Sequence, residues 1–219
     1  MAQGRITRHQ NTQNIPPKSM PTNGIVDGHE WVDLGLPSGT KWATCNVGTE
    51  KFDYYGDYFV WGNPNFVTDA TIDWKKRPQY YKQDIFSGLI NHDPATASWG
   101  AKWSTPNKEQ WEELMANCSF IWTDEYDGGV WVKSKKNGHK IYLPACGGCS
   151  GTQGLDYARF AGLYWTSTSA PTEDTYGKNI TDFAYYFLFH GNQNNNVDKM
   201  GLFTNPRQAC LSVRPVIAK

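Results

Sequence analysis

The stretch WVDLGLPSGTKWATCNVG, residues 31–48, guides the interpretation of the rest of the chain. Two short apolar segments, 31–34 and 41–44, flank a Leu-Pro-Ser-Gly sequence, which is typical of a tight turn between strands. The same kind of pattern predicts further strands at 57–61, 129–133, 140–143, 163–166, 183–189 and 211–215. Asn137 and Gly138 form a pair that favours a hairpin between the segments 129–133 and 140–143.

Two segments carry the signals of short helices. In the first, Asp93 is the expected N-cap, Pro94 the first residue, and Gly100 the stop after residue 99. In the second, Thr105 is the expected N-cap and Pro106 the first residue of a helix that ends near residue 117. Its apolar face repeats at helical spacing in Trp111, Leu114 and Met115.

The composition indicates a chain that buries a large aromatic core between short strands. Aromatic residues make up 15% of the 219 residues, and the chain also has 21 glycines. The formal net charge is zero, which argues against general nucleic-acid binding. The most apolar run, 183–189, is the length of a strand and too short to cross a membrane as a helix. We therefore expect no nucleic-acid partner, no membrane insertion and no cofactor.

Residues 1–24 differ from the rest of the chain. They are polar and rich in proline, and they contain no acidic residue. We expect an extended arm over 1–24 that docks on a partner through Arg5, Arg8 and Lys18, followed by one domain over 25–219. The segment 63–92 is polar and aromatic without periodicity, so we expect a long insertion loop there.

The arm also bears on where the protein resides. It lacks the apolar core of a secretory signal, so we expect the chain to stay in the cytoplasm or to leave inside an assembly released by lysis. A signal removed beforehand is the alternative.

The five cysteines leave at least one thiol unpaired within the chain, and all five would be thiols in a reducing compartment. Cys146 and Cys149 form a C-x-x-C, which can be half of a zinc site or a redox pair. A second ligand pair at suitable spacing is missing, so we interpret them as small residues packed in a glycine-rich turn. Cys210 stands alone before the last strand. No cluster predicts a metal site, and the motifs typical of calcium lectins do not occur.

An ordered series of motifs resembles the paralogous "major" domains abundant in Bacteroidetes and their phages. The series runs through 31–48, Gly56-Asp-Tyr-Phe-Val-Trp-Gly62, 93–103, Thr105-Pro with Trp111 and Leu114, Leu143-Pro-Ala145, Tyr164-Trp-Thr-Ser167 and Leu211-Ser-Val-Arg-Pro-Val216. The resemblance implies an α+β, C-type-lectin-like domain with two helices and several short antiparallel strands, preceded by the extended arm. Relatives of that fold include formylglycine-generating enzymes and retroelement-diversified variable proteins.

The resemblance also implies that the ligand-reading face lies in the C-terminal half. Tyrosine and asparagine are good contact residues there, because they combine area with adaptable hydrogen bonds. Strand alternation predicts that one member of each pair, 164–165 and 185–186, points inward instead. The residues expected to bind ligand are Tyr164, Tyr176, Tyr185, His190, Asn192, Asn194 and Asn195, with Tyr157, Trp165 and Tyr186 in the same region.

Together these features favour a phage virion protein, of the capsid-decoration or head-fibre type. Its arm would dock on capsid or other virion proteins, and its domain would face outward for host attachment to a glycan or protein. A homo-oligomer is expected. The alternatives are an adhesin on the bacterial cell surface or secreted, and a formylglycine-generating type of enzyme using Cys210. We expect no enzyme, because no catalytic motif is present.

Overall fold

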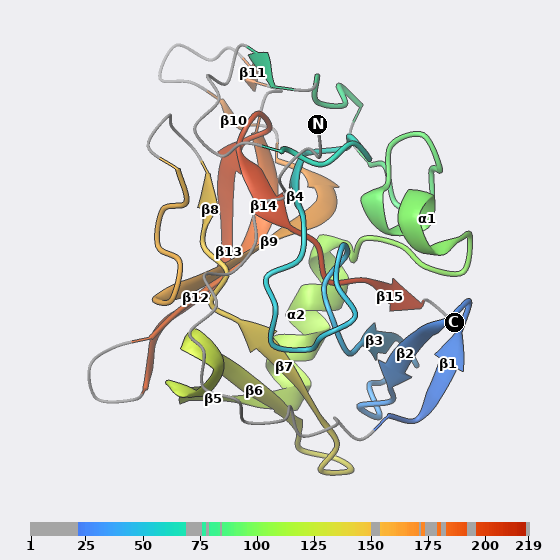
Figure 1. Ribbon diagram of the computed structural model, residues 1–219, viewed down its shortest axis with the longest axis vertical. Coiled ribbons are helices and arrows are strands. Elements are labelled where there is room, and N and C mark those ends of the chain that lie inside the picture. The colour runs from blue at the N-terminus through green and yellow to red at the C-terminus, as the bar shows by residue number, and fades with distance from the viewer. Residues whose placement is uncertain are drawn as a thin grey trace.

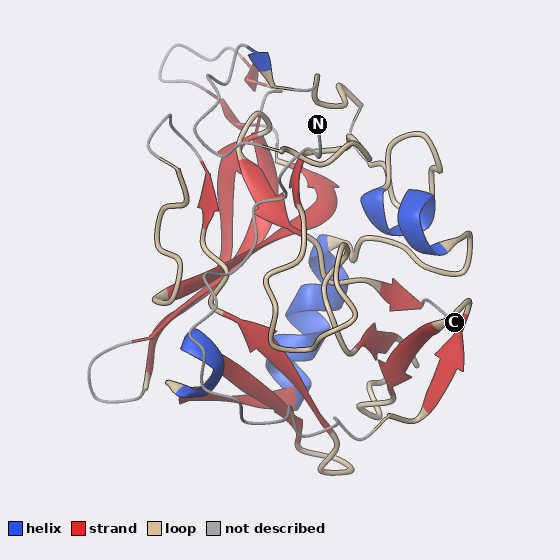
Figure 2. Cartoon of the chain, viewed as in Figure 1, coloured by secondary structure: helices blue, strands red, loops and turns tan. Residues whose placement is uncertain are grey.

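The computed structural model describes residues 22–68, 76–77, 79–83, 85–149, 154–170, 183–191 and 196–217, and the backbone of 172–173 and 179–180 (Figures 1 and 2). The arm expected over 1–24 therefore lies almost entirely outside the described residues. Within them, no helix has the length and apolar character needed to cross a membrane.

The largest sheet has six strands and is built mainly from the C-terminal half. Its order is β13 (Val197–Pro206), β12 (Phe183–Gly191), β9 (Ala161–Ser169), β14 (Cys210–Ser212) and β4 (Tyr58–Val60), and β8 (Gly148–Cys149) also pairs with β14. Neighbours are antiparallel except β14 and β9, which run parallel where Ser212 pairs with Tyr164. Strand β9 thus lies inside the sheet.

A second sheet brings the two ends of the described chain together. It has the order β1 (Gly24–Val26), β2 (His29–Val32), β3 (Lys41–Ala43) and β15 (Val216–Ile217). A third sheet is the meander β5 (Cys118–Thr123), β6 (Gly129–Ser134) and β7 (Lys140–Pro144). The hairpin predicted at Asn137 and Gly138 is confirmed, because Lys133 pairs with Lys140 across it. Strands β10 (Thr172–Glu173) and β11 (Asn179–Ile180) form a small ribbon.

The helices are short. Helix α1 (Pro94–Trp99) is confirmed with Asp93 as its N-cap and Gly100 at its end. Helix α2 (Lys108–Asn117) begins two residues later than expected, because Asn107 is its N-cap and forms a capping box with Gln110. A 3₁₀ turn, η2 (Glu125–Asp127), lies between β5 and β6.

The expected cap of α2, Thr105, has another role. Its backbone N–H and its hydroxyl both donate to the buried carboxylate of Asp93, which also accepts from Gly88, Ala95 and Thr96. Asp93 therefore caps α1 and ties that helix to the segment before α2. Because the Thr105 hydroxyl is bonded to Asp93, it does not cap α2, and Asn107 takes the N-cap position instead.

The expected α+β, C-type-lectin-like fold class is wrong. In the described part of the chain, strands make up 42% and helices 12%, arranged as three sheets of three or more strands, the small ribbon and two short α-helices. The clear capping residues of α1 and α2 led to an overestimate of the helical content. Strands of two or three residues, such as β8, β14 and β15, are too short to show an alternating pattern.

Helix α2 joins two sheets through one indole ring. Trp111 is stacked on Phe187 of β12, with centroids 4.3 Å apart, and meets Trp42 of β3 edge-on at 4.7 Å. All three side chains are buried. The six-stranded and four-stranded sheets therefore pack against the same helix, which Figure 1 shows between them.

Arg214 joins three parts of the fold at a point with no exposed surface. Its guanidinium donates to the side-chain oxygen of Asn46 at 2.8 Å, the carbonyl of Ala43 in β3 at 3.0 Å and the carbonyl of Tyr142 in β7 at 2.9 Å. Burial lowers the pKa of this guanidinium. Its planar set of donors is what satisfies acceptors on two sheets at once.

Two of the cysteines are linked. Cys149 in β8 and Cys210 in β14 face each other across the paired strands and form a disulfide, with Cα atoms 5.0 Å apart. This corrects the expectation that Cys210 stands alone. Cys45, Cys118 and Cys146 are buried free thiols, so Cys146 is packed in the core as expected while Cys149 is cross-linked.

We predict that Arg214→Lys lowers the free energy of unfolding by about 3 kcal/mol or more, because an ammonium cannot reach the three acceptors together. Urea denaturation followed by circular dichroism measures the loss. Arg159→Lys is the control, since that side chain is 63% exposed. Equal stability of the two variants would contradict this role for Arg214.

We predict that breaking the Cys149–Cys210 bond lowers the free energy of unfolding by about 4 kcal/mol, because the bond closes a loop of 61 residues in the unfolded chain. Urea denaturation with and without reductant measures this difference. The variant Cys149→Ala/Cys210→Ala should be insensitive to reductant, whereas Cys118→Ala should respond as the parent does. A reductant effect that persists in the double variant would refute the assignment.

Candidate functional site

The C-terminal residues expected to bind ligand that the structure describes do not form one site. Tyr164 has no exposed surface, and its hydroxyl donates to the carbonyl of Pro144, so it is a core residue and not part of a surface site. Tyr185 is half-buried with Lys108 above its ring, 5.5 Å from the centroid. His190, at the far end of β12, contacts Asp198 at 2.9 Å.

The expectation that one of residues 164 and 165 points outward is wrong, because both side chains are buried, in different clusters of the core. Tyr164 packs in the cluster that contains Trp111 and Phe187, and Trp165 packs in the cluster that contains Trp61. The interior strand β9 is thus covered on both faces, so its pattern carries no sign of a solvent side. The remaining candidates, Tyr176, Asn192, Asn194 and Asn195, and the arm residues Arg5, Arg8 and Lys18 lie outside the described residues.

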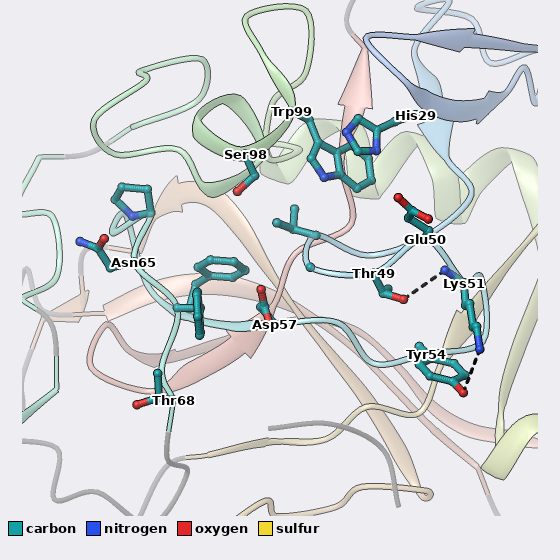
Figure 3. Close-up of a pocket in the computed structure, with 15 residues that line it drawn as sticks. His29, Thr49, Glu50, Lys51, Tyr54, Asp57, Asn65, Thr68, Ser98 and Trp99 are labelled. Atoms are coloured by element: carbon teal, nitrogen blue, oxygen red, sulfur yellow. Dashed lines mark hydrogen bonds between the residues drawn. The ribbon is translucent and has the colours of Figure 1, made fainter. Parts of the chain in front are cut away.

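A different part of the surface is hollowed. A groove of about 880 Å³ runs between β2, α1 and two segments that flank β4, 47–57 and 64–68 (Figure 3). Its lining mixes aromatic, hydroxyl, amide and charged side chains. The lining residues are His29, Val47, Gly48, Thr49, Glu50, Lys51, Tyr54, Asp57, Phe59, Pro64, Asn65, Phe66, Thr68, Ser98 and Trp99.

The base of the groove depends on a glycine. Gly48 has a φ of +89°, and a Cβ there would lie 2.3 Å from the carboxyl carbon of Asp57. The backbone N–H of Asp57 donates to the carbonyl of Val47 at 2.8 Å, which closes the loop between them. Figure 3 shows the Asp57 carboxylate near the base of the groove, below Trp99 and His29. Only glycine at position 48 leaves room for a carboxylate in this place.

One wall is a stack of two rings from distant segments. The imidazole of His29 in β2 lies 3.8 Å from the indole of Trp99 in α1, with the planes 8° apart. Trp103 meets both rings edge-on. Burial lowers the pKa of His29, and the nearby carboxylates of Glu50 and Asp27 offset part of that shift. The wall is therefore a rigid aromatic surface with a neutral imidazole at physiological pH.

The rim carries polar groups that the fold leaves available. Glu50, Asn65, Thr68 and Ser98 are exposed, and none of their side chains hydrogen-bonds to another described residue. Lys51, by contrast, is held against Tyr54, with its ammonium 3.3 Å from the phenol oxygen and 4.5 Å from the ring centroid. A ligand in the groove would meet two carboxylates, an amide and two hydroxyls beside aromatic surface.

This arrangement suits binding of a neutral, hydroxyl-rich molecule. Carboxylates accept strong hydrogen bonds from hydroxyl groups, the amide can donate and accept, and the rings cover apolar faces. The described residues contain no group of three or more His, Cys, Asp or Glu side chains placed to hold a metal ion.

The groove could not be predicted from the sequence, because four separate segments build it. One signal was present in the motifs Asn46-Val-Gly48 and Gly56-Asp57, where glycines surround a carboxylate. Gly56 has a φ of +72°, and a Cβ there would lie 2.3 Å from the carbonyl oxygen of Val47. Closely spaced glycines that hold a loop against an acidic residue indicate a shaped backbone, but they do not reveal which other segments face it. Known protein families, curated protein sequences and solved structures were compared with the chain, and no match was found.

We predict that His29 makes stability depend on pH. Its folded pKa is below its usual value of 6.5, so the folded state binds fewer protons than the unfolded chain in that range. The contribution of the His29 side chain to the free energy of unfolding is therefore complete above about pH 6.5, and it is lost as the pH falls through the folded pKa. The difference in free energy of unfolding between the parent and His29→Gln, measured by urea titration from about pH 7.5 to about pH 5, should shrink or reverse on acidification. A difference independent of pH would contradict this.

Proposed function

We propose that this chain is a non-enzymatic binding domain whose groove holds a saccharide of a cell-surface glycan. The proposal rests on one observation: a single open groove combines an aromatic wall, a carboxylate at its base and a polar rim. The side chains of that rim, Glu50, Asn65, Thr68 and Ser98, have no hydrogen-bond partner among the described residues. Sugar rings present apolar C–H faces and a periphery of hydroxyls, which matches these two kinds of surface.

The size of the groove supports this class of ligand. A volume of about 880 Å³ lies toward the upper end of the range for small-molecule sites and accommodates more than one sugar unit. A long insertion beside β4 forms part of one wall, and it is anchored by buried arginines. Arg77 donates to the carbonyls of Cys149 and Gln208, and Arg207 donates to those of Tyr81 and Gln83. The part of the insertion that lines the groove, 64–68, is itself held against β4, because the backbone N–H of Val67 donates to the carbonyl of Tyr58 at 2.7 Å and Phe66 pairs with Phe59. A segment held in place before a ligand arrives limits the entropy cost of binding.

A catalytic role for the cysteines has less support. Cys146, Cys149 and Cys210 are all buried without exposed surface. A peptide substrate of an oxidase acting through Cys210 would have to reach a sulfur that is enclosed and already bonded to Cys149. The proposal therefore assigns no reaction to this chain.

The setting we propose is display on a phage virion for host attachment, with a bacterial surface or secreted adhesin as the alternative. The resemblance of the motif series to domains of Bacteroidetes and their phages supports the first setting. Both settings require recognition of a host-surface molecule, and the groove supplies the same chemistry in either.

The test is a glycan array probed with the full chain, followed by titration of the saccharide that is retained. We predict that Glu50→Gln and Asn65→Ala each weaken binding about tenfold, because the first removes the charge that strengthens a hydrogen bond from a ligand hydroxyl and the second removes the side-chain amide that bonds to the ligand. Both residues are exposed, so neither change should affect folding.

Glu109→Gln, on the exposed side of α2 and outside the groove lining, is the matched control. Retention of a saccharide whose affinity is unchanged in both groove variants would place recognition elsewhere. Retention of no saccharide would overturn the proposal.

A further inference from the structure

On another part of the molecule, two loops meet and carry what we call the aromatic face, residues 124–127 and 156–160. The backbone N–H of Arg159 donates to the carbonyl of Ala145 at 2.7 Å, and its guanidinium lies 3.5 Å from the carboxylate of Asp127. A Cβ on Gly128 would lie 2.6 Å from the carbonyl oxygen of Arg159, so the two loops are in close contact. None of these residues lines the groove.

The backbone of the aromatic face is held in an unusual conformation. Five described residues other than glycine have a positive φ, and four of them are here: Tyr126, Asp127, Tyr157 and Arg159. Such conformations are unfavourable for residues with a Cβ, and they persist only where the surroundings enforce them. Here the contacts between the two loops are the surroundings that hold these four residues in place.

This shape presents two aromatic side chains to solvent. Tyr157 is 64% exposed and Phe160 is 62% exposed. Elsewhere in the described chain the large aromatic side chains are mostly buried. Aromatic side chains that are exposed and rigidly held are typical of a protein interaction surface.

The charge around the two rings is negative. Residues 124–127 and 156–160 carry four carboxylates, Asp124, Glu125, Asp127 and Asp156, against one guanidinium, so their formal net charge is −3. The backbone N–H of Gly191 in β12 donates to the carbonyl of Phe160 at 2.9 Å, and β13, which pairs with β12, carries Asp198 and Lys199, whose charges cancel. A complementary partner should therefore be basic.

Residues 1–21 of the chain itself have that chemistry. They contain Arg5, Arg8, Lys18 and three prolines, and no carboxylate. Proline-rich segments bind aromatic surfaces in an extended form, and arginine stacks on aromatic rings while pairing with carboxylates. Figure 1 shows β1, where this segment joins the domain, on the opposite side of the view from β5 and β6, which flank one of the loops. Twenty-one residues span at most about 70 Å, so the segment can reach a neighbouring molecule.

We propose that the aromatic face binds the N-terminal segment 1–21 of a second copy of this chain. Copies joined in this way would present several saccharide grooves on one assembly. The docking itself does not depend on what the groove binds.

The test uses sedimentation velocity of the full chain. We predict concentration-dependent self-association, and an association constant at least tenfold lower both for Tyr157→Ser/Phe160→Ser and for Arg5→Gln/Arg8→Gln/Lys18→Gln. Association should also weaken as salt is raised, because the contact pairs a basic segment with an acidic face. Leu89→Ser/Ile90→Ser is the matched control, since it removes exposed apolar side chains from a different loop.

A mixing experiment separates docking between copies from damage to the fold. The arm variant Arg5→Gln/Arg8→Gln/Lys18→Gln keeps its aromatic face, and the face variant Tyr157→Ser/Phe160→Ser keeps its arm. A mixture of the two should therefore form a heterodimer that neither forms alone. A chain that is monomeric at every concentration, or an association that both variants leave unchanged, would overturn the proposal. A full chain whose arm cross-links only to its own aromatic face would overturn it as well.

Discussion

The buried guanidinium of Arg214 is the constraint on which most of the fold depends. It satisfies acceptors on β3, on β7 and on Asn46 at the start of the loop that forms the groove. A charge without exposed surface is tolerated only where each of its donors finds an acceptor. The four-stranded sheet, the three-stranded sheet and the loop must therefore take up their relative positions together. Asn46 extends this arrangement by donating to the carbonyl of Tyr55.

The same constraint explains why a polar groove can lie beside an aromatic core. Asn46 is fixed by Arg214, and the loop that follows returns at Asp57, where its N–H meets the carbonyl of Val47. The position of the Asp57 carboxylate is thus set by hydrogen bonds within the core and by the absence of a side chain at Gly48. The groove and the aromatic face are built by different segments, so the proposed recognition of a saccharide and the proposed assembly of copies would change independently.

Local features of the structure could be predicted from the sequence, whereas features assembled over distance could not. Helix α1 and the hairpin at Asn137 and Gly138 followed from caps and turn residues a few positions apart. The start of α2 was misplaced because Thr105 is engaged by Asp93, and a tertiary contact of that kind leaves no local signal. The fold class failed for a related reason, since strands of two or three residues are defined only by their partners. The Cys149–Cys210 bond, the burial of Tyr164 and the groove likewise depend on segments far apart in the chain.

The pairing of the first and last strands in one small sheet has a mechanical consequence. Tension applied at the two ends of the domain enters at β1 and leaves at β15, and both belong to the four-stranded sheet. Strand β15 is held to β3 by only two residue pairs, Val216 with Trp42 and Ile217 with Lys41. Val216 also pairs with Ser104, so β15 ties this sheet to the segment before α2. His29 on β2 lies in the sheet through which the force passes. The Asp57 carboxylate lies off that path, so pulling on a tethered molecule would loosen one wall of the groove while its base stays in place.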